Sequence, residues 1–89
     1  MAKFLVSYDL NDGKDYSRII NELERLGAVR TQRSVYLVNV TTEESSGFLQ
    51  HLNRFVDADD FLMVVKLYER PRFTNAFRGT NDWLERNFP

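Results

Sequence analysis

The sequence contains no cysteine. Disulfide bonds, thiolate nucleophiles and zinc–thiolate sites are therefore excluded, and the composition is typical of a protein in a reducing compartment. It also lacks an excess of one charge, since 12 basic and 13 acidic side chains give a net charge of −1, so any nucleic-acid site must be a local patch. The apolar run at the N-terminus stops at Asp9, too early for a signal peptide or a membrane span. We therefore expect a cytoplasmic protein that does not contact a membrane.

The chain has a single histidine and no glycine-rich phosphate loop. His51 lies beside the apolar stripe of a predicted helix, away from any serine and aspartate arranged as a catalytic triad, so we expect a partly buried helix residue. Eighty-nine residues supply one hydrophobic core, whereas 43% hydrophobic residues leave an excess that a partner subunit can bury. We therefore expect one domain over residues 1–89 that forms a homodimer.

Hydrophobic patterning predicts four strands. Lys3–Tyr8 is a short apolar run bounded by polar residues, which predicts a strand buried on both faces, and Phe61–Tyr68 predicts a strand in a central or interface position. Between them, Ala28–Thr31 and Val35–Val40 are extended runs. Only Gln32–Ser34 separates these two runs, which predicts a tight antiparallel hairpin.

Two amphipathic helices are predicted between these strands. Apolar residues recur at helical spacing after Asp15, with Glu22 on the polar face and Gly27 as the C-terminal cap. Thr41 and Glu44 have the spacing of a capping box, in which a hydroxyl and a carboxylate each accept a backbone N–H. We therefore expect the second helix to begin there.

The order β-α-β-β-α-β predicts a ferredoxin-like α/β (α+β) fold with an antiparallel sheet. Residues 1–68 supply this core, and residues 69–89 form a C-terminal extension that is too rich in large apolar groups to be a free tail. We expect the extension to pack at the dimer interface, with a short helix over Asn81–Asn87. The topology brings the end of the first strand, the hairpin, the start of the first helix and the turn Asp57–Asp60 to one end of the sheet. That acidic turn lacks the ligand spacing of a calcium loop, and we interpret it as a turn only.

Asp9 comes directly after the first strand, where rigid backbone holds its carboxylate at the sheet's edge. This is a suitable position for a metal ligand or a general base. Mg²⁺ keeps several waters and needs at least one more oxygen ligand, which a second Asp9 in a dimer can supply. The alternative is that Asp9 only begins the loop, with its side chain accepting backbone N–H groups near Gly13.

Arginines gather in the hairpin and in the extension, where they alternate with phenylalanines. Guanidinium groups beside aromatic rings suit phosphate contact and base stacking, so these residues are candidates for nucleic-acid binding. A solvated hairpin and an ion-paired tail explain the same residues. The candidates are Arg30, Arg33, Ser34, Arg72 and Arg78, and Tyr8, Asn11 and Gln32 lie near the same motifs.

Three segments together resemble the small CRISPR-associated endoribonuclease family, the second of the two adaptation proteins. They are Phe4-Leu5-Val6-Ser7-Tyr8-Asp9-Leu10, the helix ending in Leu26-Gly27, and Gln32-Arg33-Ser34-Val35-Tyr36. The similarity covers about residues 3 to 68. The sequence resembles the SinR-like proteins of the same superfamily more closely still, through Ser7–Asn11 and Ala76–Gly79. The virulence-associated protein D toxins have the same general pattern.

The resemblance implies a ferredoxin-like homodimer in which Asp9 of each subunit faces the other. It also implies Mg²⁺ at Asp9, hydrolysis of phosphodiester bonds in RNA or DNA, and an adaptation partner protein. The function it implies is that of a metal-dependent endoribonuclease or related nuclease. Some superfamily members hold DNA without cutting it, so a non-catalytic nucleic-acid scaffold, or a protein adaptor acting through the aromatic tail, is the alternative.

Overall fold

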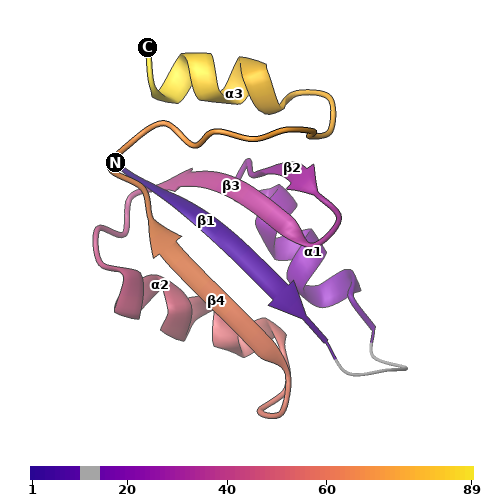
Figure 1. Ribbon diagram of the computed structural model, residues 1–89. Coiled ribbons are helices and arrows are strands. Elements are labelled where there is room, and N and C mark those ends of the chain that lie inside the picture. Colours follow the sequence, from indigo (N-terminus) through magenta and orange to yellow (C-terminus); the bar gives the residue numbers. More distant parts are fainter. Residues whose placement is uncertain (11–14) are drawn as a thin grey trace.

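A computed structural model describes residues 1–10 and 15–89. It shows a four-stranded antiparallel sheet in the order β2-β3-β1-β4, with helices in the ferredoxin-like arrangement, which confirms the predicted fold class (Figure 1). The strands are β1 (Ala2–Asp9), β2 (Val29–Gln32), β3 (Val35–Val40) and β4 (Phe61–Lys66). The helices are α1 (Ser17–Arg25), α2 (Ser45–Leu52), the 3-10 helix η1 (Asn53–Phe55) and α3 (Thr80–Asn87). No helix in this described part of the chain is long and apolar enough to cross a bilayer.

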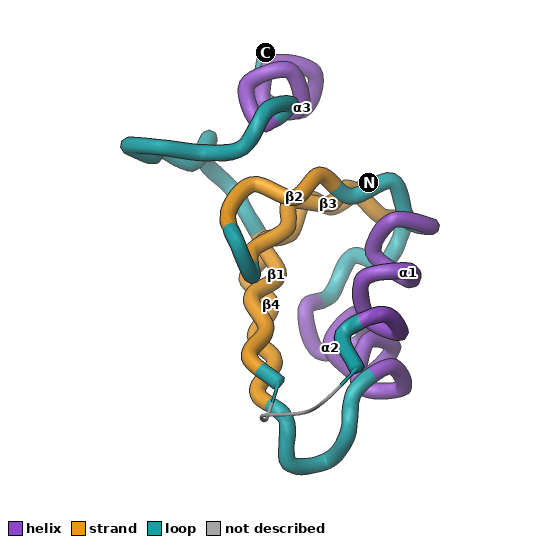
Figure 2. The backbone as a smooth tube through the Cα atoms, turned by 90° about the vertical axis from the view of Figure 1, so that its right-hand side faces the viewer, coloured by secondary structure: helices purple, strands orange, loops and turns teal. Residues whose placement is uncertain are grey.

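The main core lies between one face of the sheet and the helices α1 and α2. Figure 2 shows both helices on the same side of the sheet. The even-numbered residues of β1 point to that side and are buried, because successive side chains of a strand alternate between its faces. The prediction that this strand is buried on both faces is wrong, since Leu5 and Ser7 are only half-buried and Asp9 is exposed.

Helix α1 ends as predicted. Gly27 has a φ of 79°, a left-handed conformation that a glycine adopts without the strain of a Cβ atom. The Gly27 N–H donates to the Glu24 carbonyl at 3.0 Å, and the Ala28 N–H donates to the Leu23 carbonyl at 3.0 Å. These two bonds form a Schellman motif, which turns the chain from α1 directly into β2.

The start of α2 differs from the prediction. The residue preceding the helix is Glu44, in extended conformation, and no side-chain hydrogen bond caps the helix. The predicted capping box at Thr41 and Glu44 is therefore wrong. The physical reason is that residues 41–44 are used to cross from the end of β3 to the helix layer, so Thr41 does not adjoin the first helical turn.

Strand β4 lies at an edge of the sheet and pairs only with β1 among the described strands. Of the two predicted positions, central or interface, the central one is therefore wrong, whereas the interface position stays a prediction. Its apolar residues are divided between two environments, since Leu62 and Val64 pack on the main core, whereas Phe61, Met63 and Val65 are 66%, 64% and 45% exposed on the other face. The strand ends at Lys66, two residues earlier than predicted.

The C-terminal extension folds back over its own sheet, on the face opposite α1 and α2 (Figure 2). The predicted helix is present as α3, whose Trp83 and Leu84 are buried against Leu37 of β3. Partly buried Leu5 and Val29 complete this second, smaller core. The extension therefore covers part of the second sheet face, and the exposed residues of β4 remain outside it.

Candidate functional site

The end of β1 is joined to the β2–β3 hairpin. The Tyr8 N–H donates to the Ser34 carbonyl at 3.1 Å, and the Tyr8 ring lies 6.0 Å from the Tyr36 ring and 5.6 Å from the Tyr16 ring. Tyr16, just before α1, donates its hydroxyl to the Leu10 carbonyl at 3.3 Å. The predicted meeting of the strand end, the hairpin and the start of the first helix at one end of the sheet is confirmed.

Asp9 lies on the sheet face away from α1 and α2, and it is exposed. In the register of the sheet it pairs with Phe61, and Ser7 pairs with Met63. The Asp9 carboxylate therefore borders the exposed apolar side chains of β4. We call the surface formed by Ser7, Asp9, Phe61, Met63 and Val65 the bare face.

The Tyr8 side chain points to the opposite face of the sheet, toward α1 and α2, and packs in the core beneath the end of β1. Its side chain is buried, and burial is the main cause that raises the pKa of its hydroxyl to about 12, followed by the neighbouring Tyr36. The phenol is therefore neutral at physiological pH and is not a general base. Asn11, the other residue predicted near this motif, lies outside the described residues.

The hairpin turn consists of Arg33 and Ser34, since β2 continues through Gln32, one residue further than predicted. Arg30 donates from Nε and Nη2 to the Arg33 carbonyl at 2.9 and 2.6 Å, which fixes its guanidinium group beside the turn. The Gln32 amide donates to the Asn75 carbonyl at 3.2 Å. The hairpin is thereby held from both sides, by β1 and by the extension.

The arginines of the extension do not form one patch. Arg78 lines an open groove together with Arg30, on the side of α1. Arg72 instead lines a small cavity of about 100 Å³ with Gln32 and Phe73, between the extension and the sheet. Of the predicted candidates, the fold therefore brings Arg30 and Arg78 together and separates Arg72 from them.

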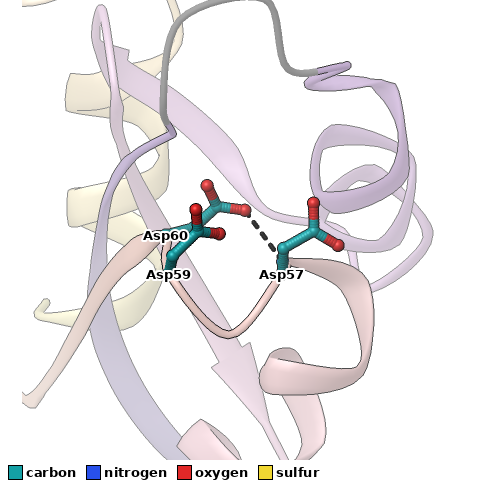
Figure 3. Close-up of side chains that lie close together, drawn as sticks. All are labelled: Asp57, Asp59 and Asp60. Atoms are coloured by element: carbon teal, nitrogen blue, oxygen red, sulfur yellow. Dashed lines mark hydrogen bonds between the residues drawn. The ribbon is translucent and has the colours of Figure 1, made fainter.

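Acidic residues cluster in the turn before β4 (Figure 3). Carboxylate oxygens of Asp57, Asp59 and Asp60 lie within 4.8 Å of one another. The Asp60 N–H donates to the Asp57 carbonyl at 3.1 Å, and the Asp57 N–H donates to Asp60 Oδ2 at 2.8 Å, so the predicted acidic turn is confirmed. Asp9 is not part of this cluster. Within the described residues of one chain, Asp9 offers a single carboxylate, which fits Mg²⁺ only where further oxygens come from a second chain or a substrate.

Comparison with protein families matches residues 1–74 to the family described as CRISPR associated protein Cas2. The chain belongs to the Cas2 family. The match spans the sheet, α1 and α2, and ends before α3. No solved structure matches the chain. The resemblance to the CRISPR-associated family is thus confirmed, whereas a closer similarity to SinR-like proteins stays a prediction.

This Cas2-family chain also contains a buried carboxylate that the sequence analysis assigned to a polar helix face. Glu22 is only 5% exposed, and it accepts hydrogen bonds from Arg25 Nε and Nη2, each at 2.7 Å. Glu22 Oε2 also lies 2.6 Å from His51 Nε2 of α2, so the carboxylate joins the two helices. These interactions, above all the hydrogen bonds from Arg25, lower the pKa of Glu22 to about 2.

A sequence signal for this burial was present. Glu22 is three residues after Ile19 and adjacent to Leu23, within the spacing of the buried helix face. The predicted role of His51 as a partly buried helix residue is confirmed, since its side chain is 33% exposed. The cluster lies on the helix layer rather than on the bare face, and its contacts are those of a structural link between α1 and α2.

Proposed function

We propose that this protein is a metal-dependent nuclease of the Cas2 family, with RNA as the expected substrate, that acts as a homodimer through paired Asp9 carboxylates. The observation that carries the proposal is the position of Asp9 on the bare face, directly across from Phe61. A partner that covers the exposed apolar side chains of β4 must also approach Asp9.

A second copy of this chain suits the bare face. Phe61, Met63 and Val65 are large apolar side chains that stand together on one strand, and monomeric proteins seldom leave such a group in water. In a two-fold symmetric dimer the same surface is used by both subunits, so each residue near the axis faces its own copy. Two copies that pack through the bare face therefore bring two Asp9 carboxylates toward each other. The extension borders this face, which supports its proposed position at the rim of the dimer interface.

The residues of each chain have distinct parts in this proposal. Asp9 of both chains would hold the metal, and Tyr8 fixes Asp9 because its ring is buried and its N–H is bonded to Ser34. Arg33 in the hairpin turn is exposed beside the same strand end, where its guanidinium group suits a phosphate of the substrate. When bound, Mg²⁺ lowers the pKa of a water molecule and offsets the negative charge of the phosphodiester.

Cleavage of labelled RNA and DNA by the purified protein tests this proposal. We expect cleavage in Mg²⁺ or Mn²⁺ that is abolished by EDTA and lost in Asp9→Asn, which keeps the side-chain shape and removes the charge. Asp59→Asn is the matched control, because it removes a carboxylate from the acidic turn at the same end of the sheet. Equal activity of the wild type and Asp9→Asn, or loss in Asp59→Asn alone, would contradict the role of Asp9.

The second candidate is a non-catalytic nucleic-acid scaffold, and the groove that contains Arg30 and Arg78 favours it. A scaffold would bind RNA or DNA equally well in the wild type and in Asp9→Asn, with an affinity that falls as salt rises. Cleavage would be absent in both.

We further propose that the protein works in the cytoplasm with an adaptation partner protein, in keeping with the Cas2 family.

A further inference from the structure

An open groove of about 510 Å³ runs between α1, β2 and the extension. Its volume falls within the range of about 300–1,000 Å³ that is typical of small-ligand sites. Ile20 and Tyr36 contribute apolar wall, Arg30 and Arg78 contribute positive charge, and Phe77 contributes an aromatic ring. Glu24 also lines the groove, so the charged side chains that line it sum to one positive charge.

Phe77 is an exposed ring on a fixed backbone. Its N–H donates to the Thr31 carbonyl at 2.9 Å, which ties the extension to the edge of β2. Its carbonyl accepts from the Thr80 N–H at 3.3 Å and from the Thr80 hydroxyl at 2.8 Å, and that hydroxyl also bonds to Thr31 Oγ1 at 3.0 Å within the protein. Although its main chain is held in this way, the side chain is 49% exposed.

The neighbouring Arg30 is equally constrained. Its two hydrogen bonds to the Arg33 carbonyl orient the guanidinium group, which lies 5.3 Å from the centre of the Phe77 ring. A guanidinium held over a half-exposed aromatic ring offers both contacts that a nucleotide uses, because the cation contacts phosphate and the part of the ring that remains exposed stacks on a base. The groove lies on the side of α1, whereas Asp9 lies on the opposite sheet face, and the two are connected through the hairpin turn, which accepts from Arg30 and is bonded to Tyr8 through Ser34.

We propose that this groove binds an unpaired nucleotide of a single-stranded nucleic acid, whose base stacks on Phe77 and whose phosphates contact Arg30 and Arg78. Bases inside a duplex are already stacked and present no face to a protein ring, so a site of this kind selects unpaired segments. The inference goes beyond the proposed function, since it names a binding site for an unpaired nucleotide on the other side of the sheet from Asp9. The stacking itself does not require cleavage.

Fluorescence anisotropy with labelled oligonucleotides in EDTA tests the inference without cleavage. The probes are one unstructured RNA, the DNA of the same sequence, and the corresponding duplexes. We expect single strands to bind at least tenfold more tightly than duplexes, and Phe77→Ala to weaken single-strand binding about tenfold. Phe77→Tyr keeps a ring and should bind within about twofold of the wild type. Tyr68→Ala, which removes a ring that is 85% exposed and does not line the groove, should also bind as the wild type does.

Equal binding by Phe77→Ala and the wild type, a preference for duplexes, or no binding of any probe at low salt would overturn the inference. Tighter binding of single-stranded RNA than of single-stranded DNA, or equal binding of both, supports it and shows whether the 2′-hydroxyl is read. Circular dichroism of Phe77→Ala checks the fold, and Phe77→Tyr keeps the test decisive if the alanine variant is unstable. If binding depends on Phe77 but the wild type does not cleave, the nuclease proposal is contradicted and this inference stands. If the wild type cleaves, and Phe77→Ala changes neither cleavage nor binding, this inference is contradicted and the nuclease proposal stands.

Discussion

Tyr8 and Ser34 are joined by a backbone hydrogen bond of 3.1 Å that ties the end of β1 to the β2–β3 hairpin. The Tyr8 ring also packs against the rings of Tyr16, just before α1, and Tyr36 of β3. The main chain that leads into Asp9 is therefore fixed both by the sheet and by the start of α1. Asp9 is thus an exposed carboxylate on a well-fixed main chain. This combination is what a metal ligand requires, since the backbone limits its position while the side chain remains accessible.

A charge placed in the bare face should separate the proposed dimer. Met63→Glu puts a carboxylate in the middle of the exposed apolar residues of β4, next to Ser7 in the register, where dimerisation would bury it beside its own copy. We expect sedimentation or light scattering to show a dimer for the wild type and a monomer for this variant. Gln50→Glu, at an exposed position of α2 on the other side of the sheet, is the control and should remain dimeric. A monomeric wild type, or a dimeric Met63→Glu, would contradict the proposed interface.

The link between α1 and α2 predicts a stability effect far from the bare face. Glu22→Gln removes the negative charge of the carboxylate that contacts both Arg25 and His51, while keeping the size of the side chain. We expect the free energy of unfolding to fall by about 2 kcal/mol, because hydrogen bonds to a buried charge are strong but the exposed Arg25 is partly screened by solvent. Urea denaturation measures the change. Glu24→Gln on the same helix, at an exposed position, should change stability by less than about 0.5 kcal/mol.

Glu22 also predicts how stability depends on pH. Its pKa is lowered in the folded state to about 2, from an ordinary value of 4.5, so the unfolded chain takes up the proton first as the pH falls. The stabilisation from Glu22 is therefore complete above pH 4.5 and lost between about pH 4.5 and pH 2. The difference in unfolding free energy between the wild type and Glu22→Gln should shrink over that range. If the difference in unfolding free energy between the two proteins stays constant from pH 7 to pH 3, the ionised form of Glu22 does not stabilise the fold.

The packing of the extension predicts a cost for removing its anchor. Trp83 is 3% exposed against Leu37, so Trp83→Ala leaves a cavity between α3 and the sheet and should lower the unfolding free energy by about 3 kcal/mol. Glu85→Ala, at an exposed position of the same helix, should change it by less than about 0.5 kcal/mol. Thermal denaturation followed by circular dichroism measures both. A small effect of Trp83→Ala would mean that the extension contributes little to the fold.

The sequence was sufficient to predict the strands and the first helix, because their signals are local. Alternating or continuous apolar runs and the glycine at the end of α1 act within one element, and Gly27 has the left-handed conformation that its position suggested. The C-terminal helix, predicted to start at Asn81, begins one residue earlier, at Thr80. The meeting of Tyr8 with the hairpin followed from topology alone, once the element order was known.

The failures concern relations between elements. The apolar pattern of β4 does not distinguish a central strand from a strand at the edge of the sheet, and the structure places β4 at the edge with Phe61 and Met63 exposed. Glu22 was assigned to a polar face because its partner His51 is 29 residues away in the sequence, and only the fold brings the two together. The arginines of the extension are close together in the sequence, but the path of the chain separates Arg72 from Arg78.

The central claim is that two Asp9 carboxylates share one metal site across a dimer, and a crystal structure of the protein grown with Mn²⁺ tests it most directly. Metal–oxygen distances of about 2 Å and room for bridging water limit the separation of the two carboxylates to about 8 Å. We predict a two-fold dimer that covers Phe61, Met63 and Val65, with the Asp9 carboxylates within that separation and a metal ion between them. A dimer formed through another surface, or one in which the Asp9 carboxylates are well over 8 Å apart, would contradict the account.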